Sequence, residues 1–126
     1  MDLNPVGWFE IYVDDMDRAR CFYEAVLGQT MEKLENSPKE EQQMCCFTGT
    51  SDSYGAGGAL VKLDSIAAGG NSTIVYFSCE NCAIEESRVE PNGGSVQQKK
   101  MPIGDYGFIS LVKDTEGNVI GLHSDM

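Results

Sequence analysis

The chain repeats one order of predicted elements, and this internal repeat limits the fold more than any other feature of the sequence. Residues 6–13, "VGWFEIYV", are rich in β-branched and aromatic side chains and predict a strand. Apolar residues then recur at helical spacing across 14–28, where Asp15 is placed to cap a helix and Gly28 to end it. Three strand-like segments follow, at 30–35, 42–48 and 58–63.

The second half of the chain has the same order. Setting Gly28 opposite Gly94 places the cap Asp15 opposite Asn81, so the two halves keep the same chemistry at the start of each predicted helix. The second predicted helix spans 82–94. The strands expected after it lie at 95–101, 107–114 and 118–124.

The predicted fold class is α+β, with two βαβββ modules. At 126 residues the chain is long enough to bury one core and too short for two independent ones. We therefore expect a single domain over 1–126, with module one at about 5–64 and module two at about 71–125.

The pair Cys79 and Cys82 raises the question of redox or zinc chemistry. The repeat places these cysteines where Val13 and Met16 stand in the first half, so we interpret both as core residues. A redox pair would need a thiol made acidic at an exposed helix N-terminus, which this arrangement still allows. A zinc site would need two more ligands, yet there is no second C-x-x-C and His123 is the only histidine.

The charge of the chain limits its partners. With 20 Asp and Glu against 9 Lys and Arg, the formal net charge is −11, which repels nucleic acid and anionic membranes. No apolar stretch approaches the ~20 residues of a membrane helix, and the N-terminus lacks the pattern of a secretory signal. Five cysteines without regular spacing suggest free thiols in a reducing compartment, so we expect a cytoplasmic protein.

Two segments, "DDMDRARCFYEAVLG" and "DTEGNVIGLHS", resemble the vicinal oxygen chelate superfamily, which includes glyoxalase I, bleomycin-resistance proteins and extradiol dioxygenases. The resemblance extends over nearly the whole chain. It implies paired βαβββ modules whose curved mixed sheets enclose a cleft. It also implies a homodimer with each cleft at or near the subunit interface.

The resemblance further implies a divalent metal held by His or Glu on the first and last strands of each module. These positions fall on Trp8, on Ile74 (or Thr73 if the register slips by one) and on Gly121, and the fourth belongs to 58–63, "GALVKL". None of these residues has a carboxylate or an imidazole, which a divalent ion prefers. We therefore expect no cofactor and no metal at the family positions.

Strand alternation defines a candidate cleft. If Trp8 faces the cleft, Glu10 and Tyr12 do so as well, and the repeat and the last strand add further residues. The loop "MPIGDYG" is either a lid or an ordinary strand connection. The expected ligand-binding residues are Trp8, Tyr12, Ile74, Tyr76 and Tyr106, and the candidate catalytic residues are Glu10 and His123.

Each of these residues also has a structural interpretation. Trp8 is equally suited to core or dimer-interface packing. Glu10 is a solvated residue at the mouth of the cleft in the simplest alternative. His123 lies close to the C-terminus, where side chains are often exposed.

Two functions of different kinds fit this cleft. In the first, aromatic walls stack on a planar small molecule, and Glu10 with the negative net charge favours a cation, as in a binding protein of the drug-resistance type. The alternative is a glyoxalase-type lyase, isomerase or dioxygenase, in which Glu10 is a general base or forms a shifted metal site with His123. A third possibility is an interaction module whose cleft is filled by its own side chains.

Overall fold

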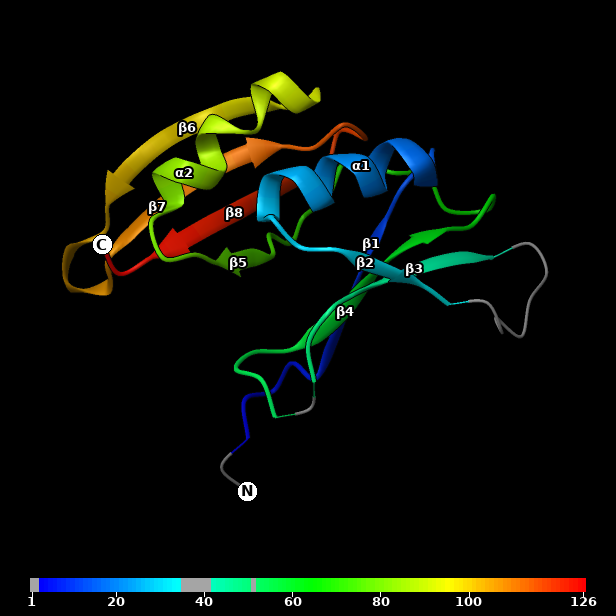
Figure 1. The fold of residues 1–126 in the computed structure, drawn as a ribbon, viewed down its shortest axis with the longest axis horizontal. Coiled ribbons are helices and arrows are strands. Elements are labelled where there is room, and N and C mark those ends of the chain that lie inside the picture. The colour runs from blue at the N-terminus through cyan, green and yellow to red at the C-terminus, as the bar shows by residue number, and fades with distance from the viewer. Residues whose placement is uncertain (1–2, 35–41, 51) are drawn as a thin grey trace.

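The computed structural model describes residues 3–34, 42–50 and 52–126, and it contains the predicted β-α-β-β-β order twice (Figure 1). The strands form two four-stranded mixed sheets, in the orders β1-β4-β3-β2 and β5-β8-β7-β6. In each sheet the first and last strands of the module pair in parallel and the other pairs are antiparallel. The elements are β1 (Trp8–Tyr12), α1 (Met16–Leu27), β2 (Met31–Lys33), β3 (Gln43–Phe47), β4 (Gly57–Lys62), β5 (Tyr76–Ser78), α2 (Cys82–Ser87), η1 (Glu90–Asn92), β6 (Ser95–Pro102), η2 (Gly104–Tyr106), β7 (Phe108–Lys113) and β8 (Val119–Ser124).

The first helix begins and ends where the sequence predicts. The side chain of Asp15 accepts the N–H of Arg18 at 3.0 Å, and Gly28 takes the left-handed conformation with φ 69°. The second helix is shorter than the predicted 82–94, because α2 ends at Ser87 and a separate 3-10 turn follows. Pro91 has no N–H to donate to the carbonyl of Ser87, so an uninterrupted helix would lose a hydrogen bond there.

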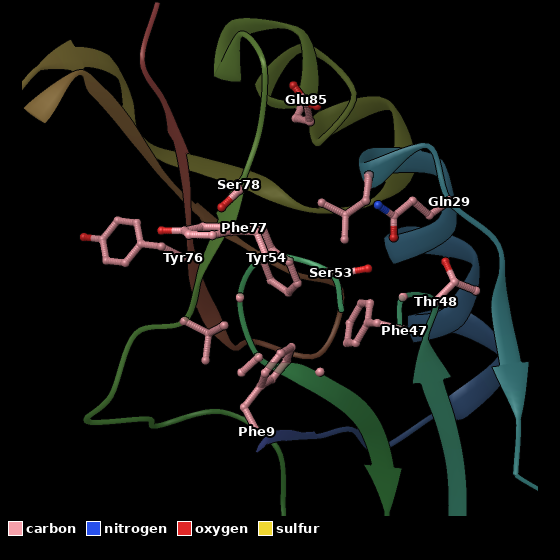
Figure 2. A pocket seen from close by; sticks show the side chains of 16 residues that line it. Phe9, Gln29, Phe47, Thr48, Ser53, Tyr54, Tyr76, Phe77, Ser78 and Glu85 are labelled. Atoms are coloured by element: carbon pink, nitrogen blue, oxygen red, sulfur yellow. The ribbon is translucent and has the colours of Figure 1, made fainter. Parts of the chain in front are cut away.

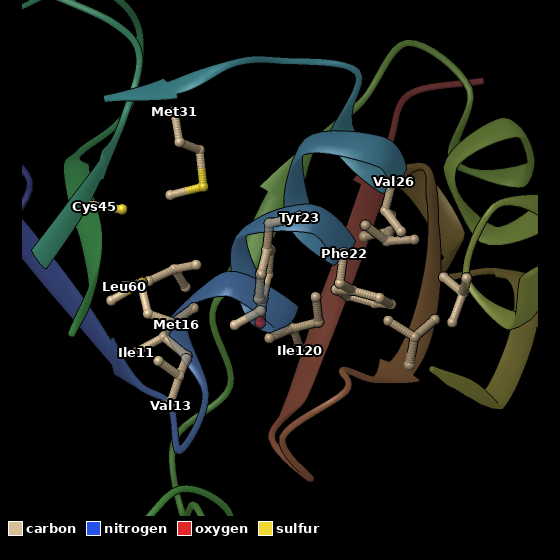
Figure 3. Packing of buried hydrophobic residues seen from close by; sticks show 14 of the residues in the cluster. Ile11, Val13, Met16, Phe22, Tyr23, Val26, Met31, Cys45, Leu60 and Ile120 are labelled. Carbon is tan, nitrogen blue, oxygen red and sulfur yellow. The ribbon is translucent and has the colours of Figure 1, made fainter. Parts of the chain in front are cut away.

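One hydrophobic core joins the two modules. Figure 3 shows α1 side chains lying between Leu60 of the first sheet and Ile120 of β8. Phe9 of β1 and Phe77 of β5 also meet across the two modules, with ring centroids 5.9 Å apart. Each sheet therefore turns one face, the inner face, toward this shared core. We call the opposite face of each sheet the outer face.

The β7–β8 turn, residues 114–118, fastens the second module to α1. The hydroxyl of the buried Tyr23 donates to Asp114 at 2.6 Å, and burial followed by the Asp114 charge raises the pKa of Tyr23 well above its ordinary value. The Glu116 carboxylate accepts two backbone N–H groups just before α1, at 2.9 and 2.8 Å, and pairs with Arg18. Buried polar groups that all find partners fix the docking of one module on the other.

The cysteine pair belongs to the core. Cys82 is fully buried, and Cys79 packs against the same cluster. Burial and the neighbouring Glu85 carboxylate raise the pKa of Cys79 to about 12, so its thiol stays protonated and unreactive at neutral pH. All five cysteines are free thiols.

Candidate functional site

Three predicted site residues form a hydrogen-bonded row on the outer face of β1. Trp8, Glu10 and Tyr12 alternate with residues that pack in the core, as the sequence predicts. The Trp8 indole donates to Glu10 Oε2 at 3.2 Å, and the Tyr12 hydroxyl donates to Glu10 Oε1 at 3.1 Å. Partial burial of Tyr12 and the adjacent Glu10 carboxylate raise the pKa of its hydroxyl. The row therefore presents one carboxylate between two aromatic side chains.

Small residues of β4 lie beneath this row. In the parallel β1–β4 pair, Trp8 is opposite Gly57 and Glu10 is opposite Ala59. The Trp8 ring lies over Gly57, since a Cβ added there would be 3.5 Å from the ring. The indole is still 50% exposed, which leaves surface for a ligand or another chain to contact.

The outer face of the second sheet carries a second group. Tyr76 is paired with Gly121, and its ring covers that glycine so closely that a Cβ there would overlap the ring. His123 Nε2 lies 2.7 Å from the carbonyl oxygen of Tyr106. A carbonyl only accepts hydrogen bonds, so Nε2 carries the proton and donates it. Ile74, Tyr76 and Tyr106 are all exposed.

These two groups lie on different sheets, and only some of their members border a cavity. Glu10 and Tyr12 border a cavity of about 300 Å³ near the start of β8, whereas Tyr76 borders another of about 240 Å³. In the part of the chain that the structure describes, no hydrogen bond or ion pair joins Glu10 to His123. One chain therefore presents the predicted site residues as two separate groups.

The family metal positions hold residues that do not fit a divalent ion. The strand register makes Ala59 the first-module counterpart of Gly121, so the four positions carry Trp8, Ala59, Ile74 and Gly121. None has an oxygen or nitrogen side-chain ligand for a metal, and the Tyr76 ring fills the space above Gly121. Among residues 3–34, 42–50 and 52–126, no three His, Cys, Asp or Glu side chains cluster as a metal site would require.

Sequence reasoning missed a cavity on the inner side of the sheets. It lies between β5, α2 and the loop after β3, as Figure 2 shows, and Glu85 borders it. The repeat held one signal, because it places Glu85 opposite Ala19, which is fully buried in α1. A carboxylate at the counterpart of a core position indicates that the surroundings of the two helices differ.

The family comparison agrees with this architecture. Residues 6–49 match the family model of the bleomycin resistance protein-like N-terminal domain. The chain has the vicinal oxygen chelate fold. The α+β fold of two modules that the resemblance implied is thereby confirmed.

Solved structures with the same vicinal oxygen chelate fold include enzymes and a binding protein. Glyoxalase I from Zea mays has a TM-score of 0.76 and 16% identity over 96% of this chain, which spans 46% of the maize chain. A glyoxalase-related enzyme from Fulvimarina pelagi has a TM-score of 0.68 and 14% identity over 97% of this chain and 88% of its own. TnmS3, an antibiotic-binding protein from a Streptomyces species, has a TM-score of 0.64 and 22% identity over 98% of both chains.

Comparison with curated protein sequences gives no match. Among the described residues, no helix is both long enough and apolar enough to cross a membrane.

Proposed function

We propose that the protein binds a planar organic cation on the outer face of β1 and does so without a metal. The observation that carries this proposal is the row of Trp8, Glu10 and Tyr12, in which a carboxylate is held between two aromatic side chains. A planar cation gains from stacking on the indole and from the charge of Glu10. Glu10 and Tyr12, though not Trp8, also border a cavity of about 300 Å³, which offers further contact beside the carboxylate.

The charge of the whole chain supports the same ligand class. A net charge of −11 raises the local concentration of cations and lowers that of anions. The antibiotic-binding protein TnmS3 has this fold along its whole length, which is a precedent for binding without assigning a ligand to this chain.

We further propose that the site is completed in a homodimer. Trp8, Ile74 and Tyr76 are 50%, 39% and 46% exposed on the outer faces, which is unfavourable for large apolar side chains in a lone chain. A second copy that lays its second sheet over the first sheet would bring Tyr76 and His123 opposite Glu10. We place this dimer in the cytoplasm, where five free thiols stay reduced.

The binding test uses the only tryptophan of the chain as its reporter. We expect proflavine, a planar cation, to quench Trp8 emission and to bind at least about tenfold more tightly than anthracene-9-carboxylate, a planar anion. Calorimetry should show that Glu10→Gln weakens proflavine binding by about tenfold, whereas Glu90→Gln, an exposed carboxylate of η1, changes it by less than about twofold. Equal affinity for the two dyes, or an unaltered affinity in Glu10→Gln, would contradict the proposal.

Metal analysis separates this binding function from the enzymatic alternative. After incubation with Ni²⁺, Zn²⁺, Fe²⁺ or Mn²⁺ and gel filtration, we expect much less than one bound ion per chain, because the four family positions carry no ligands. Retention of one ion per chain that is lost in Glu10→Gln or His123→Ala would favour a glyoxalase-type enzyme with a shifted site.

A further inference from the structure

A cavity of about 240 Å³ lies between the two modules on the inner side of the sheets (Figure 2). We call it the Glu85 cavity. Its volume lies a little below the ~300 Å³ at which sites for drug-sized ligands begin, so it suits a molecule with a single ring. Phe9, Phe47 and Phe77 line it together with parts of the β3–β4 loop, α2 and β5.

The walls of the Glu85 cavity are aromatic. The Phe9 and Phe47 ring centroids are 5.6 Å apart, and those of Phe47 and Phe77 are 5.4 Å apart. Tyr54, which is 93% exposed, also borders the cavity and lies at its mouth. Rings at these spacings offer both faces and edges to an additional aromatic ring.

One carboxylate oxygen at the Glu85 cavity has no partner. Glu85 Oε1 is buried, and no hydrogen bond reaches it in the described part of the chain. Buried carboxylate oxygens cost free energy unless a donor satisfies them. The adjacent Cys79 thiol has its pKa raised to about 12 by burial, by the Glu85 charge and by a hydrogen bond with the Glu85 side chain, so it is a neutral neighbour that does not balance the charge. The missing partner is therefore a donor, and preferably a cation.

The internal repeat shows how the corresponding place beside α1 is filled. The β7–β8 turn occupies it there, and Glu116 of that turn accepts two backbone N–H groups and pairs with Arg18. The counterpart of that turn is the β3–β4 loop, which contributes Thr48, Gly49 and Ser53 among the lining residues. The described residues of this loop have no charged side chain at the cavity, and the repeat places Ile84 where Arg18 stands in α1, so no Lys or Arg lines the cavity beside Glu85. An ion pair between the modules thus closes this place beside α1, whereas the corresponding place beside α2 is an open cavity bordered by a carboxylate.

We propose that the Glu85 cavity is a second binding site, which takes a small organic ammonium ion carrying one aromatic ring. The ammonium donates to Glu85 Oε1, and the ring packs on Phe47 and Phe77. This site differs from the outer face of β1, because Phe9 and Phe47 point to the inner side while Glu10 points to the outer side. The Glu85 cavity and the cavity beside the row share Phe9 and Val75 as lining residues, whereas Glu10 and Tyr12 border only the cavity beside the row.

The test measures benzylammonium binding to the full chain by NMR titration of the ¹⁵N-labelled protein. We expect saturable shifts at Ser78 and Glu85 with a Kd of about 1 mM or below, a reasonable affinity for so small a ligand. Benzyl alcohol, which lacks the charge, should bind at least about tenfold more weakly. Shifts confined to Trp8 and Glu10, or no saturation by about 20 mM, would overturn the proposal.

Variants separate a ligand-binding carboxylate from a structural one. Glu85→Gln should weaken benzylammonium binding by about tenfold while the melting temperature stays the same or rises, because only a neutral thiol interacts with the lost charge in the free chain. Glu80→Gln, an exposed carboxylate near the same helix, should change binding by less than about twofold. Ala56→Leu, which fills the cavity from its exposed rim, should block binding without removing any charge. Unchanged binding in Glu85→Gln, or binding that persists in Ala56→Leu, would refute the assignment.

Discussion

The contribution of Glu116 to the free energy of unfolding can be predicted from its contacts between the two modules. Its side chain is fully buried, accepts two backbone N–H groups near the start of α1 and forms a 2.6 Å ion pair with Arg18. Burial alone would raise its pKa, but these hydrogen bonds outweigh burial and lower the pKa from 4.5 to about 2. The carboxylate is therefore more stable in the folded chain than in the unfolded chain.

The size of the effect follows from linkage. One pKa unit corresponds to about 1.4 kcal/mol, so the change from 4.5 to about 2 corresponds to about 3 kcal/mol of folding free energy at pH 7. The Arg18 side chain is 52% exposed and partly screened by water, so we expect nearer 2 kcal/mol for Glu116→Gln. Because the folded pKa is the lower one, this stabilisation is complete above about pH 4.5 and is lost as the pH falls toward 2.

Urea unfolding followed by circular dichroism measures this stabilisation directly. Glu116→Gln should lower the free energy of unfolding by about 2 kcal/mol at pH 7 and by less than half of that at pH 3. Glu90→Gln, on the exposed face of η1, should change it by less than about 0.5 kcal/mol at both pH values. A loss below about 1 kcal/mol at pH 7, or a loss that is the same at both pH values, would refute the account of Glu116 as the residue that fastens the modules.

Two further predictions concern glycine and cysteine positions. Gly121→Ala should destabilise the chain by about 1–3 kcal/mol in thermal unfolding, because the added Cβ overlaps the Tyr76 ring. The double variant with Tyr76→Ala should recover much of this loss, and additive losses would contradict the contact. Iodoacetamide at pH 8 should modify the exposed Cys21 first and leave Cys79 and Cys82 unmodified in the native chain, as followed by mass spectrometry. Early labelling of Cys79 would contradict its burial and its raised pKa.

Much of the fold follows from local sequence patterns. Alternation along 8–12 places Trp8, Glu10 and Tyr12 on one face because side chains of an extended strand point to opposite sides in turn. The ends of α1 follow from Asp15 and Gly28, whose side-chain and backbone preferences act within one helical turn.

The candidate site was predictable in part. The row on β1 needs only strand alternation, so its members are the ones that the sequence places correctly relative to one another. The contact between His123 and the Tyr106 carbonyl depends on how η2 packs beside β8. No local sequence pattern specifies that packing. Sequence spacing alone therefore gives no distance between Glu10 and the imidazole.

The sequence by itself determined the order of elements, the repeat and the buried face of each strand, because these depend on neighbouring residues and on a period that can be counted. Only the tertiary structure decided which polar groups find partners. The turn that carries Asp114 and Glu116 looks like an ordinary polar turn, yet it docks against α1 and is buried. Glu85 resembles a solvated helix residue, yet one of its oxygens is enclosed without a donor. Both outcomes depend on how the β3–β4 and β7–β8 connections pack across the modules, and long-range packing leaves no periodic trace in the sequence.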